Sequence, residues 1–128
     1  MFAAIETLES GPLRGWSLPR VCPSRDRPVD LVHLSIQAMG DRALEAEILD
    51  LLRTQIAAIT ASLIGADDAR RAATAHAMAG TARNVGAFSL AAAASRLEGE
   101  PENAAHLASF EKEMARVALF LRSMQQPV

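Results

Sequence analysis

The sequence contains one cysteine, one lysine and no tyrosine, and aromatic residues make up only 4% of its 128 residues. With Cys22 alone, the chain can form neither an internal disulfide nor a cysteine-based metal site. A core with so few aromatic rings must consist of Ala, Leu, Ile, Val and Met, which favours closely packed helices over a sheet. No apolar run approaches the roughly 20 residues that a membrane-spanning helix needs.

No charge of one sign dominates either, because the formal net charge is −2 and the basic residues are scattered. A nucleic-acid-binding protein normally carries a clustered basic face, and binding to a membrane surface needs a similar cluster. We therefore expect neither kind of partner. Glu6 and Glu9 lie where a secretory signal peptide would carry positive charge, so we expect a cytoplasmic protein.

Residues 1–27 differ in composition from the rest of the chain. Glycine and proline recur between residues 11 and 28 at a density that helices do not tolerate. A short helix is expected over residues 1–8, and Trp16 and Leu18 either dock on the folded domain or belong to a loose segment. We interpret residues 1–27 as an N-terminal extension, partly helical or flexible, and residues 28–126 as one folded domain.

From residue 30 onward, apolar residues recur at intervals of three and four, which is the spacing of one helix face. Asp41, and either Asp67 or Asp68, are suitable N-cap residues, and we place Pro101 in the first turn of the last helix. Short connections favour antiparallel neighbours, so we predict an all-α fold: an up-and-down four-helix bundle with a short N-terminal capping helix. The predicted helices cover residues 30–38, 41–64, 67–85, 88–98 and 101–124.

The third predicted helix carries the candidate site. Its apolar stripe, formed by Ala75, Met78, Ala82 and Val85, should face the other helices. His76 lies roughly 100° around the helix from Ala75 and is therefore expected on the outer face. Its neighbours there are small, so the imidazole should stand open to solvent. The residues that we place on this outer face with His76 are Ala72, Ala73, Ala79, Gly80 and Arg83.

Gly80 is unusual because glycine inside a helix costs about 1 kcal/mol relative to alanine. It follows His76 by one turn on the same face. Two explanations remain open from the sequence: a docking partner approaches the helix backbone at Gly80, or another helix of the same chain packs closely against it.

The segment His76-Ala77-Met78-Ala79-Gly80-Thr81-Ala82-Arg83-Asn84-Val85-Gly86-Ala87 resembles the signature of histidine-containing phosphotransfer (HPt) domains. The order of helices is also similar, over about residues 27–124. This resemblance implies that His76 accepts a phosphoryl group from a phosphorylated receiver domain or hybrid kinase and passes it to a response-regulator aspartate. It also implies a docking surface around His76, which we assign to Ala73, Ala79, Gly80, Thr81 and Arg83. The positions that match the signature are His76, Met78, Gly80, Thr81, Val85, Gly86 and Ala87.

The chain departs from the signature at Ala79, where the family usually has a lysine that helps to hold the phosphoryl group. Arg83 follows His76 by two turns, about 10 Å along the helix axis, and is our candidate for a replacement charge. Arg70 and Arg71 could add positive potential to the docking face. The resemblance further implies that the chain has no cofactor of its own and that the partner receiver domain supplies Mg²⁺.

Other kinds of catalytic site lack a signal in the sequence. No Gly-rich run precedes a Lys-Ser/Thr pair, so we expect no kinase activity from ATP and interpret the chain as a phosphoryl carrier rather than an autonomous enzyme. His33 and His106 are expected at the surface or its boundary, without a metal.

We expect a monomer whose partners are receiver domains and a sensor or hybrid histidine kinase. Two alternatives are a receiver-binding module without phosphate and a structural helical-bundle dimer with His76 in its interface.

Overall fold

The computed structural model describes residues 27–125. The expected helix over residues 1–8 and the docking of Trp16 and Leu18 lie outside this part of the chain. Among the described residues all regular secondary structure is helical, which confirms the predicted all-α class. Five helices follow one another: α2 (Leu31–Gln37), α3 (Arg42–Ser62), α4 (Asp68–Val85), α5 (Phe88–Gly99) and α6 (Ala104–Gln125).

Aspartates begin three of these helices. The Asp41 carboxylate accepts a hydrogen bond from the Leu44 amide at the start of α3, as predicted. Asp67 caps α4 through the Arg70 amide, which settles the choice between Asp67 and Asp68. Asp30 caps α2 in the same way. Each carboxylate satisfies amides that the first helical turn leaves without a partner.

The predicted start of the last helix is wrong. Pro101 lies in a turn, and α6 begins only at Ala104. The reason is Asn103, whose side-chain oxygen accepts hydrogen bonds from the amides of Ala105 and His106 at 2.9 and 3.1 Å. An asparagine at this position satisfies two amides of the first turn, whereas a proline can only occupy the first turn without capping it.

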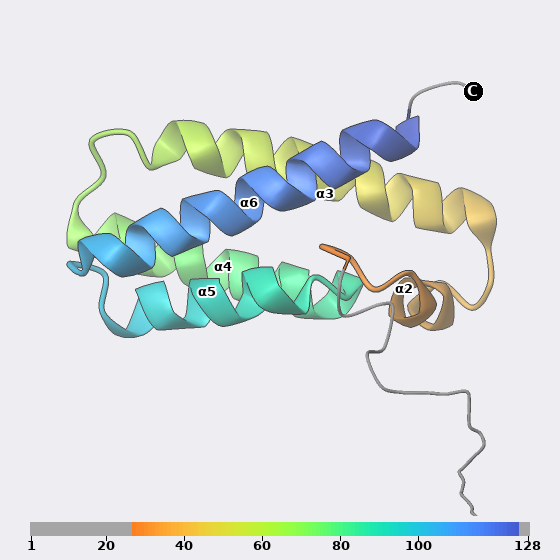
Figure 1. Cartoon of the computed structure of the whole chain (residues 1–128), viewed down its shortest axis with the longest axis horizontal. Coiled ribbons are helices and arrows are strands. Elements are labelled where there is room, and N and C mark those ends of the chain that lie inside the picture. Colours follow the sequence, from red (N-terminus) through yellow and green to blue (C-terminus); the bar gives the residue numbers. More distant parts are fainter. Residues whose placement is uncertain (1–26, 126–128) are drawn as a thin grey trace, which may run out of the picture.

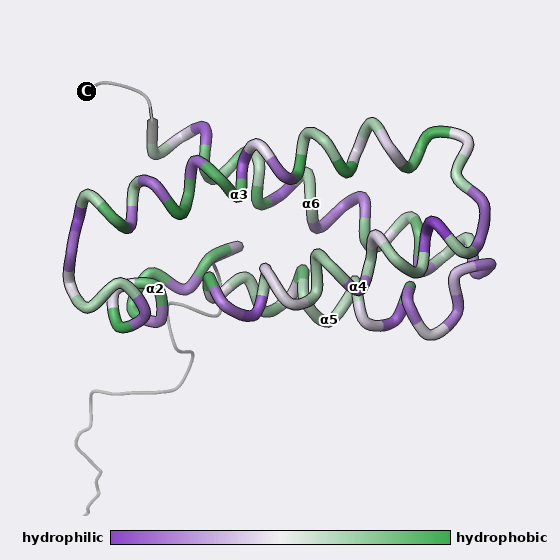
Figure 2. The backbone as a smooth tube through the Cα atoms, turned by 180° about the vertical axis from the view of Figure 1, so that it is seen from behind, coloured by the Kyte–Doolittle hydropathy of each residue, from purple (hydrophilic) through white to green (hydrophobic). Residues whose placement is uncertain are grey.

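The four long helices lie side by side and alternate in direction (Figure 1). In that view α3 and α6 form an upper pair and α4 and α5 a lower pair, with α2 beside the end where α3 begins. Along each helix hydrophobic and hydrophilic stretches alternate (Figure 2), as expected for helices with one face in a core. Among residues 27–125, none of these helices combines the length and the hydropathy needed to cross a bilayer.

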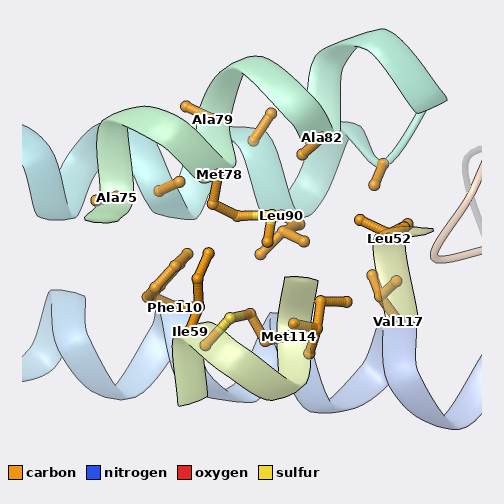
Figure 3. Packing of buried hydrophobic residues seen from close by; sticks show 14 of the residues in the cluster. Leu52, Ile59, Ala75, Met78, Ala79, Ala82, Leu90, Phe110, Met114 and Val117 are labelled. Atoms are coloured by element: carbon orange, nitrogen blue, oxygen red, sulfur yellow. The ribbon is translucent and has the colours of Figure 1, made fainter. Parts of the chain in front are cut away.

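The core fills the space between the two pairs. Figure 3 shows Met78 of α4 and Leu90 of α5 pointing toward Ile59 of α3 and toward Phe110 and Met114 of α6. Burying each of these large side chains contributes about 1.5–3 kcal/mol. The core parts of α4 and α5 are rich in alanine, whose small side chain lets two helices approach closely; the buried alanines of the cluster on these helices are Ala75, Ala79, Ala82, Ala91 and Ala94.

Gly86 joins the end of α4 to the start of α2. It adopts a left-handed conformation with φ of 87°, which ends the helix. Its carbonyl oxygen accepts a hydrogen bond from the Asp30 amide at 2.9 Å. A Cβ atom at this position would lie 2.9 Å from the Asp30 carbonyl oxygen. Only glycine therefore allows the contact that holds α2 against α4.

Candidate functional site

His76 lies in the middle of α4 with 76% of its side chain exposed. The apolar stripe that precedes and follows it is buried as predicted: Ala75, Met78, Ala82 and Val85 all belong to the core. Because His76 is rotated away from this stripe, its ring projects beyond the helix surface. The sequence-based prediction of an exposed imidazole is confirmed.

A carboxylate on the neighbouring helix fixes the orientation of this ring. The Nδ1 atom of His76 lies 2.8 Å from Oε2 of Glu98 on α5. An ionised carboxylate only accepts hydrogen bonds, so Nδ1 must be the donor. In the neutral imidazole the remaining nitrogen, Nε2, then carries the free electron pair. Because most of the ring is exposed, Nε2 is accessible to an incoming group.

Glu98 was not identified from the sequence, although a signal was present. His76 and Glu98 lie eleven residues before and eleven residues after Ala87, at the turn between α4 and α5. In an antiparallel helical hairpin, residues equally distant from the turn lie at about the same height. The equal spacing from the turn could have predicted that His76 and Glu98 lie at the same height. It does not predict that their side chains face each other.

A second polar pair bridges the same two helices. Arg83 donates a hydrogen bond from Nη2 to Oγ of Ser95 at 3.1 Å, and both residues are exposed. We call the set of His76, Arg83, Ser95 and Glu98 the polar seam of α4 and α5. The predicted candidate charge, Arg83, thus lies on the seam that also holds His76.

Gly80 also lies beside this seam and is partly exposed. A Cβ atom built on Gly80 would meet no atom within 4 Å. Close packing of another helix among residues 27–125 therefore does not explain the glycine. Approach of a docking partner, the other explanation that the sequence left open, stays a prediction.

Ala79 is not on the exposed face, so this part of the sequence-based prediction is wrong. It is 2% exposed and packs in the core. The physical reason is helical geometry: Ala79 follows the buried Ala75 by four residues, so both lie on the same buried side of α4. Of the other assigned docking residues, Ala73 is exposed and Thr81 is partly exposed.

The two arginines that precede His76 differ in their surroundings. Arg70 is exposed. Arg71 is partly buried, and it donates a hydrogen bond from Nη1 to the Pro101 carbonyl oxygen at 3.3 Å. Arg71 thus braces the turn between α5 and α6, whereas Arg70 remains accessible on the surface.

The other two histidines lie at the boundary of the surface, as predicted. The His33 ring contacts Phe88 edge-on, with 5.1 Å between the ring centres. His106 is partly buried, and its Nε2 atom lies 3.6 Å from a carboxylate oxygen of Glu100. Within residues 27–125 no group of three or more His, Cys, Asp or Glu side chains is arranged to hold a metal ion.

Comparisons of the chain with protein-family models, with curated proteins and with solved structures found no match.

Proposed function

We propose that this protein is a histidine phosphotransfer protein of a two-component phosphorelay. His76 accepts a phosphoryl group from a phosphorylated receiver domain or hybrid kinase and passes it to the aspartate of a response regulator. The observation that carries this proposal is the geometry of His76, whose ring is 76% exposed while Glu98 holds Nδ1 at 2.8 Å. We further propose that the protein acts in the cytoplasm.

The chemistry follows from the tautomer that Glu98 selects. The free electron pair of Nε2 attacks the phosphorus atom of an aspartyl phosphate, and an N–P bond forms as the P–O bond to the aspartate breaks. The aspartate leaves as a carboxylate. The proton on Nδ1 stays in place, so the ring of the phosphorylated histidine carries a positive charge. The Glu98 carboxylate lies against that charge and stabilises it through a charge-assisted hydrogen bond.

The proposed fold is an antiparallel up-and-down bundle of α3, α4, α5 and α6, with α2 as a short capping helix. The alternating directions of the four long helices support this arrangement (Figure 1). In such a bundle α4 and α5 form a rigid hairpin, because alanines from both helices pack in the core between them. A rigid hairpin keeps His76 and Glu98 in register while a partner docks, which matters because phosphoryl transfer depends mainly on positioning.

In this proposal the partner receiver domain supplies the aspartyl phosphate and the Mg²⁺ ion, and this chain supplies the nucleophile and a docking surface. That surface consists of Ala73, Gly80, Thr81 and Arg83 around His76. Arg83 takes part of the role of the lysine that the HPt signature has in place of Ala79. The Ser95 hydroxyl that accepts its hydrogen bond is uncharged, so the positive charge of the guanidinium is not neutralised and remains available to a phosphoryl group or an acidic receiver surface.

The test is phosphorylation of the full chain by a panel of phosphorylated receiver domains, with mass-spectrometric mapping of the modified residue. We expect a phosphoryl group on His76 in the wild type and none in His76→Gln, with unchanged helicity and melting because the ring is exposed. His106→Gln is the matched control and should accept phosphate at the wild-type rate. Retained phosphorylation of His76→Gln would refute the site.

The same assay tests the role of Glu98. In Glu98→Ala the ring loses the hydrogen bond that fixes its orientation and tautomer, so we expect phosphorylation to be slower by up to about fivefold, as for loss of a solvent-exposed pair worth up to about 1 kcal/mol. A wild-type rate in this variant would show that Glu98 does not prepare the nucleophile.

A receiver-binding module that carries no phosphate is the second candidate. Ala79 favours it, because the lysine that holds the phosphoryl group in the HPt signature is absent here and the position is buried. Such a module would bind receiver domains with the same affinity in the wild type and in His76→Gln, and no label would appear on His76.

A further inference from the structure

The two hydrogen bonds of the polar seam cross from α4 to α5 in different directions. His76 and Glu98 are equally far along the chain from Ala87 at the turn, so their hydrogen bond joins residues at the same height. Arg83 lies four residues from Ala87, whereas Ser95 lies eight residues from it. The hydrogen bond from Arg83 to Ser95 therefore slants along the helix axes.

This slant directs the Arg83 side chain toward His76. The residue of α5 at the height of Arg83 is Ala91, and Ser95 lies four residues farther from the turn, which corresponds to about 6 Å along the axis. Arg83 follows His76 by seven residues, or two turns, so both lie on one face of α4. Side chains of a helix lean toward its N-terminus. For Arg83 that is the direction of His76, so its backbone favours the same orientation.

The slant also brings the arginine charge closer to His76 than the positions of the two backbones suggest. Along α4 the Cα atoms of His76 and Arg83 are about 10 Å apart. Ser95 precedes Glu98 by three residues, so its height differs from that of His76 by only about 4.5 Å. Because Nη2 of Arg83 lies 3.1 Å from Oγ of Ser95, the guanidinium lies near the height of Ser95.

We propose that Ser95 is a positioning residue that holds the Arg83 charge beside the phosphorylated His76. This inference rests on the proposed function and adds a residue to its site. A guanidinium has five N–H groups, and the bond to Ser95 uses Nη2, so phosphoryl oxygens can bind the other N–H groups. Ordering a long side chain costs rotamer entropy. Ser95 orders Arg83 before the partner docks, which lowers the entropy that transfer itself must lose.

The experiment measures phosphoryl transfer from a phosphorylated receiver domain to the full chain. Ser95→Ala should slow the transfer by about two- to threefold, the size expected for one hydrogen bond between exposed side chains. Ser95→Thr keeps the hydroxyl group and should restore the wild-type rate. Ser89→Ala is the matched control, because Ser89 is another exposed serine of α5. It should transfer at the wild-type rate, and circular dichroism should be the same for all variants.

A double-mutant cycle tests whether Ser95 acts through Arg83. If it does, adding Ser95→Ala to Arg83→Ala should slow the transfer no further. The inference is overturned if Ser95→Ala transfers at the wild-type rate. It is also overturned if Ser95→Thr is as slow as Ser95→Ala, or if Ser95→Ala has the same effect with and without Arg83.

A measurement on the unphosphorylated protein tests the restraint itself. The NMR order parameter of the Arg83 Nε–Hε bond reports motion of the side chain on the picosecond to nanosecond timescale. It should fall in Ser95→Ala and stay unchanged in Ser89→Ala; equal values in the wild type and Ser95→Ala would overturn the inference. A wild-type chain that takes no label on His76 would refute the proposed function and this role of Ser95 together. Normal wild-type transfer with an unaffected Ser95→Ala would refute the role of Ser95 alone.

Discussion

Replacing Gly80 by alanine should make the protein more stable and at the same time a poorer phosphate acceptor. Alanine is about 0.8–1.0 kcal/mol more favourable than glycine inside a helix. At Gly80 no steric cost offsets this gain, because the added Cβ would meet no atom within 4 Å. We therefore expect the free energy of unfolding to rise by about 1 kcal/mol, which corresponds to an increase in Tm of roughly 4–8 °C for a domain of this size.

The same methyl group would stand one turn from His76, where we propose that the backbone of a receiver domain approaches. We therefore expect Gly80→Ala to accept phosphate more slowly than the wild type. Urea denaturation and thermal melting measure the first effect, and transfer from a phosphorylated receiver domain measures the second. A loss of stability would refute the steric reasoning. A gain in stability with an unchanged transfer rate would show that Gly80 has no part in docking.

Two further predictions concern the ends of α4 and its polar seam. Gly86→Ala should lower the free energy of unfolding by about 2–5 kcal/mol, because a left-handed alanine costs about 1–2 kcal/mol and contact with the Asp30 carbonyl adds an overpacking cost of about 1–3 kcal/mol. Gly65 also has a positive φ, 71°, but a Cβ there would meet no atom within 4 Å. Gly65→Ala should therefore lower the free energy of unfolding only by the cost of the left-handed backbone. If urea denaturation gave the same loss for Gly65→Ala and Gly86→Ala, this account would be contradicted. Arg83→Ala should slow phosphoryl transfer modestly, and an unchanged transfer rate would remove Arg83 from the mechanism.

The helices and the all-α class were largely predictable because their signals are local. Asp41 and Gly86 mark helix ends through hydrogen bonds and backbone angles that depend on a few neighbouring residues. The start of α6 was missed because two local signals competed. Pro101 is compatible with a first turn, but the Asn103 side chain supplies hydrogen bonds to two amides and so decides where the helix begins.

The candidate site was predictable only in part, because it depends on how two helices pair. His76 was found from its rotation relative to a buried stripe on its own helix. Glu98 belongs to another helix, and its contact with His76 depends on the register and rotation of α5. Ala79 was misplaced for a related reason: its neighbours in the sequence suggest an open face, but the packing of the helices buries it.

The backbone hydrogen bond between the Asp30 amide and the Gly86 carbonyl determines how far the chain can be shortened from its N-terminal side. Val29, directly before Asp30, is fully buried in the core. A deletion that stops ahead of Val29 removes none of these contacts. A deletion that extends through α2 would leave the Gly86 carbonyl without its partner and would uncover the end of the helix that carries His76. A minimal version built around the hairpin of α4 and α5 must therefore retain a stretch of chain that lies more than forty residues upstream of His76.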